Sequence, residues 1–434
     1  MTLVLFAGMA YWSSPIPLAE DWLLVAPLTG HEPNLAAWVW AQNNEHRSPL
    51  SRLLLLALLQ ASHGDFSVSG YFNIVVLSAA TALAIIASSK LRGRIDVADI
   101  FFPLTLLHLG HSVQFLFGWQ LTFVLPVVIL IAIECVLFGP RSITSRSGAF
   151  VVGSGLVLLP LCGGGNGLLY VPTLGALLLY FGWRCRAQHC EASQQRSLAL
   201  WHFSSAILTL LVSAIYFIGY QKPTWNPPSP GIVPSAKTAL KVLALGFGPI
   251  VEKAWVPFIM LALGLTIATA CCALRACARD QGFARERAIG ATVFLLTAMT
   301  AACAVGWVRA GYVPEFGIPT RYALLVTPAF CACFFAWESF ASSAAVQRIL
   351  AAVMLVLLPF NTWAGHTMFA AWYTDGMKAL HLDLGKGIPL EEIATKHRSF
   401  LIHWWEPGRL AQQMQWLRDA GITPFNQPQE RGVR

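Results

Sequence analysis

Long apolar stretches separated by short polar loops recur along most of the chain. A transmembrane helix needs about 20 predominantly apolar residues, and stretches approaching that length run from the first residues to about position 366. The pattern predicts an all-α fold, a polytopic transmembrane helix bundle of about eleven spans. The expected spans are residues 1–18, 71–89, 98–110, 118–138, 149–162, 168–183, 199–219, 254–274, 289–309, 322–341 and 349–366.

Two segments depart from this pattern and lie outside the expected spans. Residues 19–70 form a long polar and aromatic first loop, in which 34–42 and 49–62 have the pattern of helices lying at the membrane interface. Residues 367–434 are charged, and a helix is expected after Pro407 and before Gly421, since proline favours a helix start and glycine the position after its end. We therefore expect a transmembrane domain, residues 1–366, and a small helical tail, residues 367–434.

The composition excludes a soluble protein. Hydrophobic residues make up 56% of the chain and charged residues 12%, whereas soluble domains average about 45–50% and 25%. The net charge of +8 is distributed over loops and indicates membrane topology rather than nucleic-acid binding. The ten cysteines show no CxxC pair and no metal spacing, so we expect neither structural disulfides nor a zinc site.

The basic residues favour one orientation, because loops rich in lysine and arginine stay on the cytoplasmic side. If the first loop lies outside, the outer loops, including the first, hold eight basic residues, and the inner loops hold 13. We expect an integral protein of the plasma (inner) membrane, with a cytoplasmic N-terminus and an extracytoplasmic first loop and tail. The inner residues are Lys90, Arg92, Arg94, Arg141, Arg146, Arg184, Arg186, Arg196, Arg275, Arg279, Arg285, Arg287 and Arg348.

The first candidate for chemistry is an acidic pair directly after the first span. Glu20 and Asp21, followed by Trp22, offer two carboxylates at a membrane exit, where they can act as a general base or bind a metal. A solvated helix cap is the alternative interpretation of such a pair.

The second candidate is the polar run from Asn43 to Pro49. Ser48 and Pro49 fit an N-cap and a first helical position, so Arg47 would lie beside a helix N-terminus. An arginine and a helix N-terminus together suit a phosphate or diphosphate. The alternative is that Arg47 pairs with Glu45 or with lipid headgroups.

Two more clusters are expected on the outer side. Arg309, Arg321 and Tyr322 flank the loop before the tenth span, where an arginine can equally be a simple interfacial side chain. His108, His111, Gln114, Trp119 and Gln120 lie on a broken helix pair and either line a cavity or bond within the core.

A glycine-rich turn and a proline-rich loop add positions near these clusters. Residues 163–167 lack the lysine and hydroxyl of a phosphate loop, so they predict a tight turn that lets helices approach closely and from which Asn166 can face the site. Residues 225–230 predict a stiff outer loop that could act as a lid.

Taken together, these motifs resemble the GT-C class of integral-membrane glycosyltransferases, including a group of bacterial polytopic proteins assigned to it. Members of this class carry an acidic pair in the first outer loop and use polyprenyl-phosphate sugar donors. The chain lacks the large outer domain of better-known members, and its first helix is short. The matching segments are residues 20–22, 42–47, 118–120, 165–168, 320–322 and 421–425.

The resemblance implies transfer of a sugar from a polyprenyl-phosphate donor to a cell-envelope glycan or lipid, with inversion. It assigns Asp21 as the catalytic base, supported by Glu20, and a divalent metal, Mg or Mn, would be held by the same two carboxylates. It places the donor phosphate on His46, Arg47 and Arg321. Further substrate-pocket residues are Asn44, Glu45, His111, Gln120, Asn166 and Tyr322.

Two other functions fit a polytopic chain. A transporter or flippase for a lipid-linked glycan would need ionisable residues near mid-membrane, where this chain has few, and an envelope polysaccharide polymerase or ligase would place its polar residues in a late outer loop. The transferase hypothesis makes one specific geometric demand: Asp21 and Arg47 should border one cavity.

Overall fold

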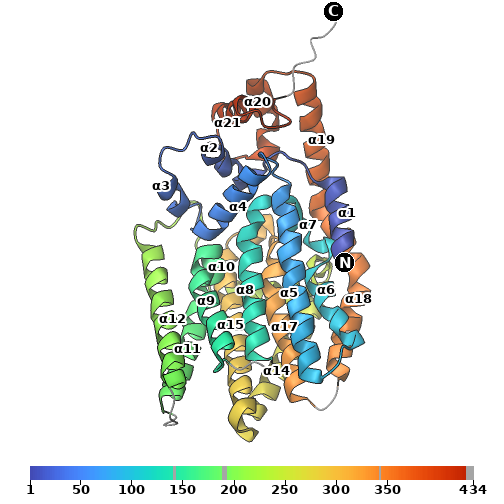
Figure 1. Ribbon diagram of the computed structural model, residues 1–434. Coiled ribbons are helices and arrows are strands. Elements are labelled where there is room, and N and C mark those ends of the chain that lie inside the picture. Colours follow the sequence, from blue (N-terminus) through green and yellow to red (C-terminus); the bar gives the residue numbers. More distant parts are fainter. Residues whose placement is uncertain (140–142, 188–192, 342–343, 427–434) are drawn as a thin grey trace, which may run out of the picture.

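The computed structural model describes residues 1–139, 143–187, 193–341 and 344–426, and this part of the chain is helical without a β-strand (Figure 1). Its main helices are α1 Thr2–Trp12, α2 Val25–Leu28, α3 Leu35–Trp40, α4 Pro49–Ala61, α5 Val68–Arg92, α6 Phe101–Leu106, α7 Ser112–Leu116, α8 Leu121–Leu137, α9 Arg146–Cys162, α10 Gly165–Leu168, α11 Val171–Ala187, α12 Ser193–Phe217, α13 Ile232–Ala244, α14 Trp255–Arg279, α15 Gly282–Arg309, α16 Val313–Phe316, α17 Tyr322–Phe340, α18 Ala345–Gly365, α19 Ala371–Gly385, α20 Leu390–Leu401 and α21 Pro407–Asp419.

Seven helical segments of the described residues are long and apolar enough to cross a membrane, which confirms the membrane class. The count of about eleven spans stays a prediction, because α9 and α11 have 17 residues each and the remaining expected spans are shorter or broken. The seven are Val68–Arg92, Gly118–Leu137, Gln195–Phe217, Trp255–Arg279, Gly282–Arg309, Tyr322–Phe340 and Ala345–Gly385.

The first helix is shorter than expected. α1 has 11 residues and ends at Trp12, so it is about 17 Å long against a hydrocarbon core of about 30 Å. The chain then continues in extended form, and Ser14 binds the tail: its N–H donates to the Tyr373 hydroxyl at 3.1 Å, and its hydroxyl lies 3.1 Å from Nε2 of His381.

The region expected as the span 98–110 is a series of short helical pieces. Between α6 and α8 lie α7 and the 3₁₀ turns Leu109–His111 and Gly118–Gln120. A Cβ atom at Gly110 would lie 2.9 Å from the Asn361 carbonyl oxygen, so the glycine allows the break to pack closely on α18. The broken helix expected for this region is therefore present.

The tail continues directly from the last apolar helix. α18, a π-helical turn at His366–Ala370 and α19 form one rod that extends beyond the bundle, and α20 and α21 pack beside its far part (Figure 1). The expected boundary at 366 and 367 thus falls within continuous helix.

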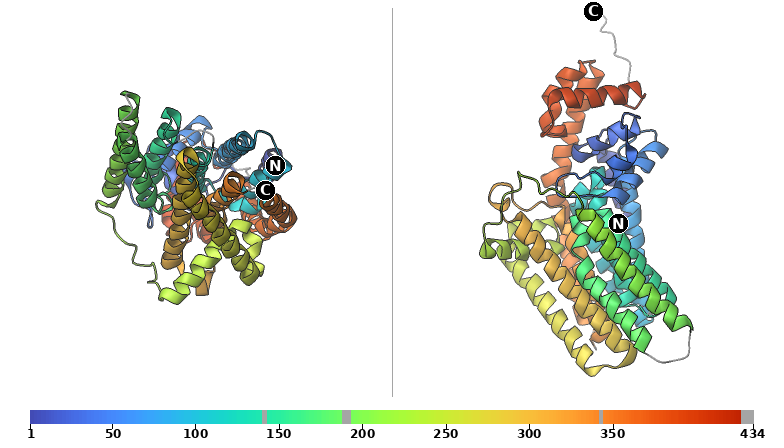
Figure 2. Two further views of the ribbon diagram at one scale, coloured as in Figure 1. Left: turned by 90° about the horizontal axis from the view of Figure 1, so that it is seen from below. Right: turned by 90° about the vertical axis from the view of Figure 1, so that its left-hand side faces the viewer.

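The tail and the first loop lie at the same end of the bundle, as the second view also shows (Figure 2). The His31 and Trp416 rings stack with centroids 4.3 Å apart, and Trp22 meets Phe425 edge-on at 6.2 Å. These contacts join α21 to the first loop and make the two segments one layer over the bundle.

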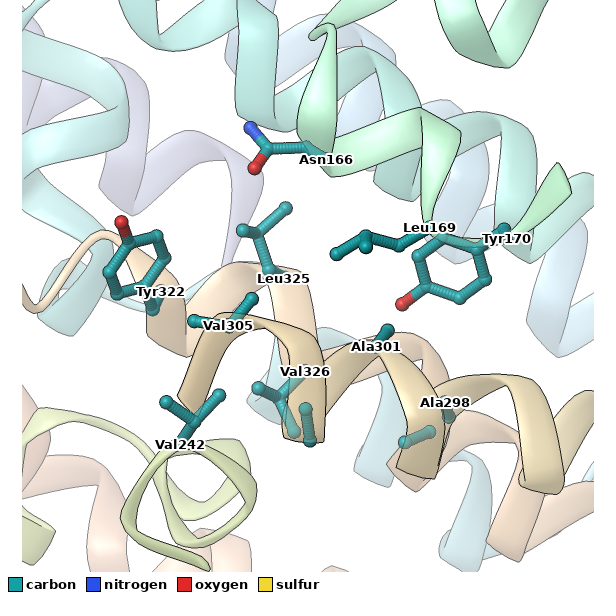
Figure 3. A pocket seen from close by; sticks show the side chains of 12 residues that line it. Asn166, Leu169, Tyr170, Val242, Ala298, Ala301, Val305, Tyr322, Leu325 and Val326 are labelled. Atoms are coloured by element: carbon teal, nitrogen blue, oxygen red, sulfur yellow. The ribbon is translucent and has the colours of Figure 1, made fainter. Parts of the chain in front are cut away.

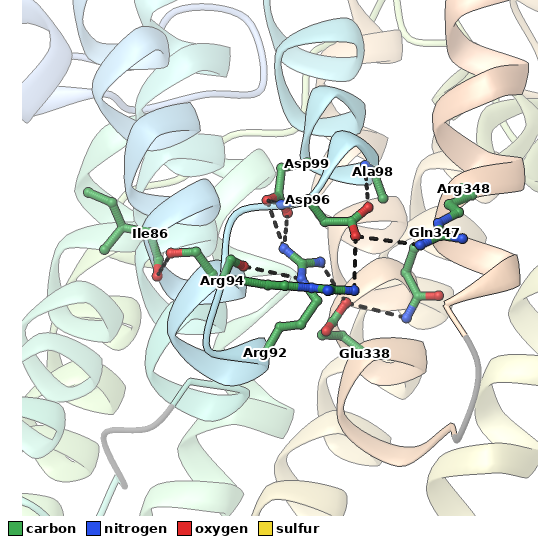
Figure 4. Close-up of polar contacts among 10 residues, drawn as sticks. Ile86, Arg92, Arg94, Asp96, Ala98, Asp99, Glu338, Gln347 and Arg348 are labelled. Carbon is green, nitrogen blue, oxygen red and sulfur yellow. Dashed lines mark hydrogen bonds and ion pairs between the residues drawn. The ribbon is translucent and has the colours of Figure 1, made fainter.

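An ion network closes the opposite end of the bundle (Figure 4). The Arg92 guanidinium at the end of α5 donates to both Asp99 oxygens at 2.8 and 2.7 Å, and to the Glu338 carboxylate of α17 at 3.1 Å. Nearby, Arg348 of α18 lies 3.6 Å from Asp96. The network joins four segments of the bundle. Of the basic residues expected at this end, Arg141 lies outside the described residues.

Replacing Arg92 should destabilise the bundle. In Arg92→Ala, the carboxylates of Asp99 and Glu338 stay buried without their cation, and breaking a buried pair in this way costs about 3 kcal/mol or more. The matched control is Arg94→Ala, because Arg94 is largely exposed and its pair with Asp96 spans 3.7 Å; such surface pairs contribute about 0–1 kcal/mol. Thermal unfolding in detergent measures both, and equal melting temperatures for the two variants would contradict this interpretation.

Candidate functional site: a polar cavity under the first loop and tail

A polar cavity of about 790 Å³ lies where the first loop, the bundle and the tail meet. Its lining combines two carboxylates, two guanidinium groups, two imidazoles, several amides and aromatic rings. The lining residues are Glu20, Asn43, Asn44, Glu45, His46, Trp119, Gln120, Thr122, Phe123, Trp225, Asn226, Arg309, Tyr312, Gly317, Pro319, Arg321, His403 and Trp404.

Glu20 is the carboxylate of the acidic pair that reaches the cavity. It lies in the 3₁₀ turn Ala19–Leu24, directly after the extended stretch that ends α1. Burial raises the pKa of Glu20 above its usual range, and the nearby positive charges of Arg321 and His403 partly offset this rise. A carboxylate with a raised pKa in a cavity suits proton abstraction near neutral pH.

The structure places Asp21 differently from the expectation. Its side chain is 3% exposed and does not belong to the cavity lining. Its two oxygens accept hydrogen bonds from the backbone N–H groups of Gly118 at 3.2 Å and Trp119 at 2.7 Å. Burial raises the pKa of Asp21 to about 8, and the Trp119 and Gly118 N–H groups act in the opposite direction. Asp21 therefore caps the start of the Gly118–Leu137 helix.

A tight turn presents Asn44, Glu45 and His46 to the cavity. Asn43 and His46 exchange backbone hydrogen bonds of 2.8 and 2.9 Å across the turn, and Asn44 takes a positive φ of 51°. The Gly165 N–H lies 3.3 Å from Nδ1 of His46, which therefore accepts. Burial lowers the pKa of His46, and the nearby Glu45 carboxylate opposes this shift. Because Nδ1 accepts, the ring donates through Nε2, which lies 3.6 Å from Oε1 of Glu45.

Arg47 does not line the cavity and neither does Asp21, so the two residues do not border this cavity as predicted. Its side chain is buried, its Nη1 donates to the Ile218 carbonyl at 2.8 Å, and its guanidinium lies 6.0 Å from the Trp40 ring centroid. The alternative partner, Glu45, instead pairs with Arg309. The predicted helix start is confirmed, since Ser48 is the N-cap of α4 and Pro49 its first residue, but Arg47 points away from the cavity.

Two arginines supply the positive charge of the cavity. Arg309, at the end of α15, pairs with Glu45. Arg321, at the start of α17, has no ion-pair partner among the described residues, and its guanidinium lies over the rings of Phe123 at 5.8 Å and Tyr322 at 6.0 Å. Its carbonyl accepts from the Gln114 side chain at 2.8 Å. Arg321 is therefore a positioned cation available for an anionic ligand.

The histidines of the broken segment lie in the core instead of the cavity. The rings of His108 and His111 are 4.1 Å apart, and Nε2 of His111 lies 3.0 Å from the Thr105 carbonyl. Both side chains are buried, and neither lines the cavity. Gln120, from the same region, does reach it. The two histidines therefore bond within the core, whereas Gln120 lines the cavity.

A mostly apolar groove of about 390 Å³ adjoins the cavity. It shares Glu45, His46, Asn226 and Arg309 with the cavity, so the two spaces lie side by side. The predicted residues Asn166 and Tyr322 line the groove rather than the polar cavity. Its apolar lining residues are Leu168, Leu169, Phe217, Ala304, Val305 and Val308.

The groove continues into a small hollow between the helices. A cavity of about 30 Å³ lies between α10 and the turn after it, α13, α15 and α17, and shares Asn166, Leu169, Val305 and Tyr322 with the groove (Figure 3). Valine, leucine and alanine side chains make up most of its wall. The site therefore passes from a polar head region into an apolar interior.

His403, Trp404 and Asn226 line the cavity but were absent from the residues predicted from the sequence. His403 and Trp404 lie between α20 and α21, about 380 residues after Glu20 in the chain. The sequence feature that could have predicted them is the run of one histidine and two tryptophans in an otherwise charged tail. Their place in the site depends on the tail folding back over the first loop.

The divalent metal expected on Glu20 and Asp21 stays a prediction. The described residues contain no group of three or more histidine, cysteine, aspartate or glutamate side chains arranged for a metal ion. Both Asp21 oxygens accept backbone hydrogen bonds, so Glu20 is the carboxylate of the pair that lines the cavity. The chemistry below is derived from side chains alone.

The glycine-rich turn should be sensitive to one added methyl group. Gly164 has a φ of 57°, and a Cβ there would lie 2.7 Å from the Tyr216 hydroxyl and 3.0 Å from the Arg47 carbonyl oxygen. Gly164→Ala should destabilise by at least about 1 kcal/mol through left-handed strain alone. Gly175→Ala is the control, since its Cβ meets nothing within 4 Å and alanine favours helix by up to about 1 kcal/mol. Thermal unfolding of both variants tests this prediction. A Gly164→Ala protein as stable as the wild type would contradict the close approach of Gly164 to Tyr216 and Arg47.

The cavity can hold an anion at Arg321, accept a proton at Glu20 and bind an apolar chain in the adjoining groove. Comparison of the chain with protein-family models, with curated proteins and with solved structures gives no match. Its function is therefore inferred from this combination of groups.

Proposed function

We propose that the protein is a membrane glycosyltransferase that moves a sugar from a polyprenyl-phosphate donor to a cell-envelope acceptor outside the cytoplasm. One observation carries the proposal: a cavity with charged and polar lining residues adjoins an apolar groove, and the two share four lining residues. Such a site fits an amphiphile with an anionic head and a long hydrocarbon tail. The basic residues of the inner loops favour placing this end of the bundle outside the cytoplasm.

The charges around the cavity suggest how the donor binds. Its phosphate would lie at Arg321, the cation without an ion-pair partner among the described residues, while the Arg309 guanidinium is shared with Glu45. His46 can add a hydrogen bond through Nε2. The polyprenyl chain would follow the groove past Leu168 and Leu169.

In the proposed reaction, Glu20 takes the role that the family resemblance gave to Asp21. The Glu20 carboxylate accepts the proton of an acceptor hydroxyl while that oxygen forms a bond to the anomeric carbon of the sugar. The bond from this carbon to the phosphate oxygen breaks, and the electron pair leaves with polyprenyl phosphate. Attack opposite the leaving group inverts the anomeric centre. Arg321 stabilises the negative charge that develops on the phosphate.

The first test is Glu20→Gln, which removes the proton acceptor and keeps the shape of the side chain. Transfer from a synthetic polyprenyl-phosphate sugar should fall at least a hundredfold, the lower range for general base catalysis. The control is Glu32→Gln in the same loop, because Glu32 does not line the cavity and accepts a hydrogen bond from the nearby Asn34 N–H at 3.2 Å. Transfer at the wild-type rate in Glu20→Gln would exclude Glu20 as the base.

The pH profile of the wild-type enzyme gives a second readout for Glu20. A base must be deprotonated, and burial raises the pKa of Glu20, so the rate should increase with pH through a midpoint above the usual glutamate value of about 4.3. This acidic limb should disappear from any residual activity of Glu20→Gln. A midpoint at or below the usual value would contradict the assigned environment.

The second variant is Arg321→Gln, which removes the available cation. The KM for the polyprenyl-phosphate donor should rise and kcat should fall, since a charge-assisted hydrogen bond is worth about 1.5–3 kcal/mol. Arg47→Gln should affect stability more than donor use, because Arg47 binds a backbone carbonyl away from the cavity. If the KM for the donor were unchanged in Arg321→Gln but altered in a stably folded Arg47→Gln protein, Arg47 would be the phosphate-binding residue instead of Arg321.

A flippase for a lipid-linked glycan is the second candidate, because it would also need a polar head site joined to an apolar groove. Reconstituted vesicles separate the two functions. Transfer of labelled sugar to an acceptor on the donor side, without movement of the lipid across the bilayer, supports the transferase. Movement of the lipid without bond cleavage, unchanged in Glu20→Gln, supports the flippase.

A further inference from the structure

Two tryptophans in the lining of the polar cavity have about half or more of their surface exposed. Trp225, in the loop between α12 and α13, is 65% exposed, and Trp404, between α20 and α21, is 48% exposed. The neighbouring Trp405 is buried and lies 3.9 Å beneath the Arg409 guanidinium. The Trp404 ring meets the His403 ring edge-on, with centroids 4.8 Å apart.

Uncharged amides make up much of the polar lining near these rings. Asn43, Asn44, Gln120 and Asn226 all belong to the lining. The Asn226 Oδ1 already accepts from the Tyr312 hydroxyl. Primary amides suit a ligand that carries hydroxyl groups, because both kinds of group can donate and accept hydrogen bonds.

We propose that this part of the cavity is a carbohydrate-binding site that holds the acceptor through sugar rings stacked on Trp225 and Trp404. The C–H face of a pyranose is apolar and weakly positive, so it suits the negative face of an indole ring, while its hydroxyls suit the amides. A volume of about 790 Å³ is in the upper part of the range of about 300–1,000 Å³ for small-molecule pockets. That the bound sugar is the acceptor rests on the proposed transferase function, whereas sugar binding at this site does not depend on it.

Exposed tryptophans also anchor membrane proteins at the bilayer interface, and two other tryptophans of this chain provide the comparison. Trp372 on α19 is 48% exposed, as Trp404 is, and Trp307 on α15 is 53% exposed. Neither lines the cavity. An anchoring role would make all four substitutions similar, whereas sugar binding separates the cavity pair from the control pair.

The test is saturation-transfer-difference NMR on the full chain in lipid nanodiscs. The probes are the methyl glycosides of glucose, galactose, mannose and N-acetylglucosamine. We expect saturation transfer to at least one glycoside, strongest at its ring C–H protons. Trp225→Ala and Trp404→Ala should each weaken its Kd at least tenfold, and Trp307→Ala and Trp372→Ala should leave it within twofold.

The outcomes also separate this proposal from the transferase proposal. No transfer to any of the four glycosides, or a Kd unchanged in the variant that lacks both Trp225 and Trp404, overturns the sugar site. Tryptophan-dependent binding in a protein that transfers no sugar from polyprenyl-phosphate donors keeps the site and removes the transferase. A folded Gln120→Ala protein should also lose affinity, and the melting temperature of each variant shows whether its binding was measured on folded protein.

Discussion

The candidate site depends on the hydrogen bonds that Asp21 accepts from the start of the Gly118–Leu137 helix. A helix start leaves backbone N–H groups without partners, and the Asp21 carboxylate satisfies those of Gly118 and Trp119. These bonds attach the first loop to the bundle at one position. They also fix the neighbouring Glu20 at the cavity and bring the Trp119 ring into its wall. The acidic pair thus divides its tasks, with one carboxylate positioning the loop and the other facing the ligand.

The position of the cavity follows from the cost of placing charge in a bilayer. Ionisable groups gather at the two ends of the bundle, in the Arg92 network at one end and in the cavity at the other. At the cavity end the tail closes over the first loop, so His403 and Trp404 join the site. The apolar groove then connects this polar end with the helix interior. A ligand with a polar head and an apolar tail is the natural occupant of such a site.

The all-helical fold class could be predicted from the sequence, because apolar stretches of about 20 residues form α-helices in a membrane. The start of α4 at Pro49 could be predicted for a similarly local reason, since proline favours the first helical turn. The roles of Asp21 and Arg47 could not, because each depends on which backbone groups fold against it: the Gly118 and Trp119 N–H groups for Asp21, and the Ile218 carbonyl for Arg47. Local sequence places a charge near a membrane surface but does not say whether it faces a cavity or a neighbouring loop.

The central claim is that one site binds both the phosphate and the hydrocarbon chain of a lipid donor. Photo-crosslinking with a polyprenyl phosphate that carries a diazirine on its chain, followed by peptide mapping, tests it most directly. The account predicts crosslinks at Leu168, Leu169 and Val308, which line the groove beside the polar cavity. Crosslinks that concentrate instead at Trp12 and Trp363, in the separate apolar hollow between α1 and α18, would contradict it.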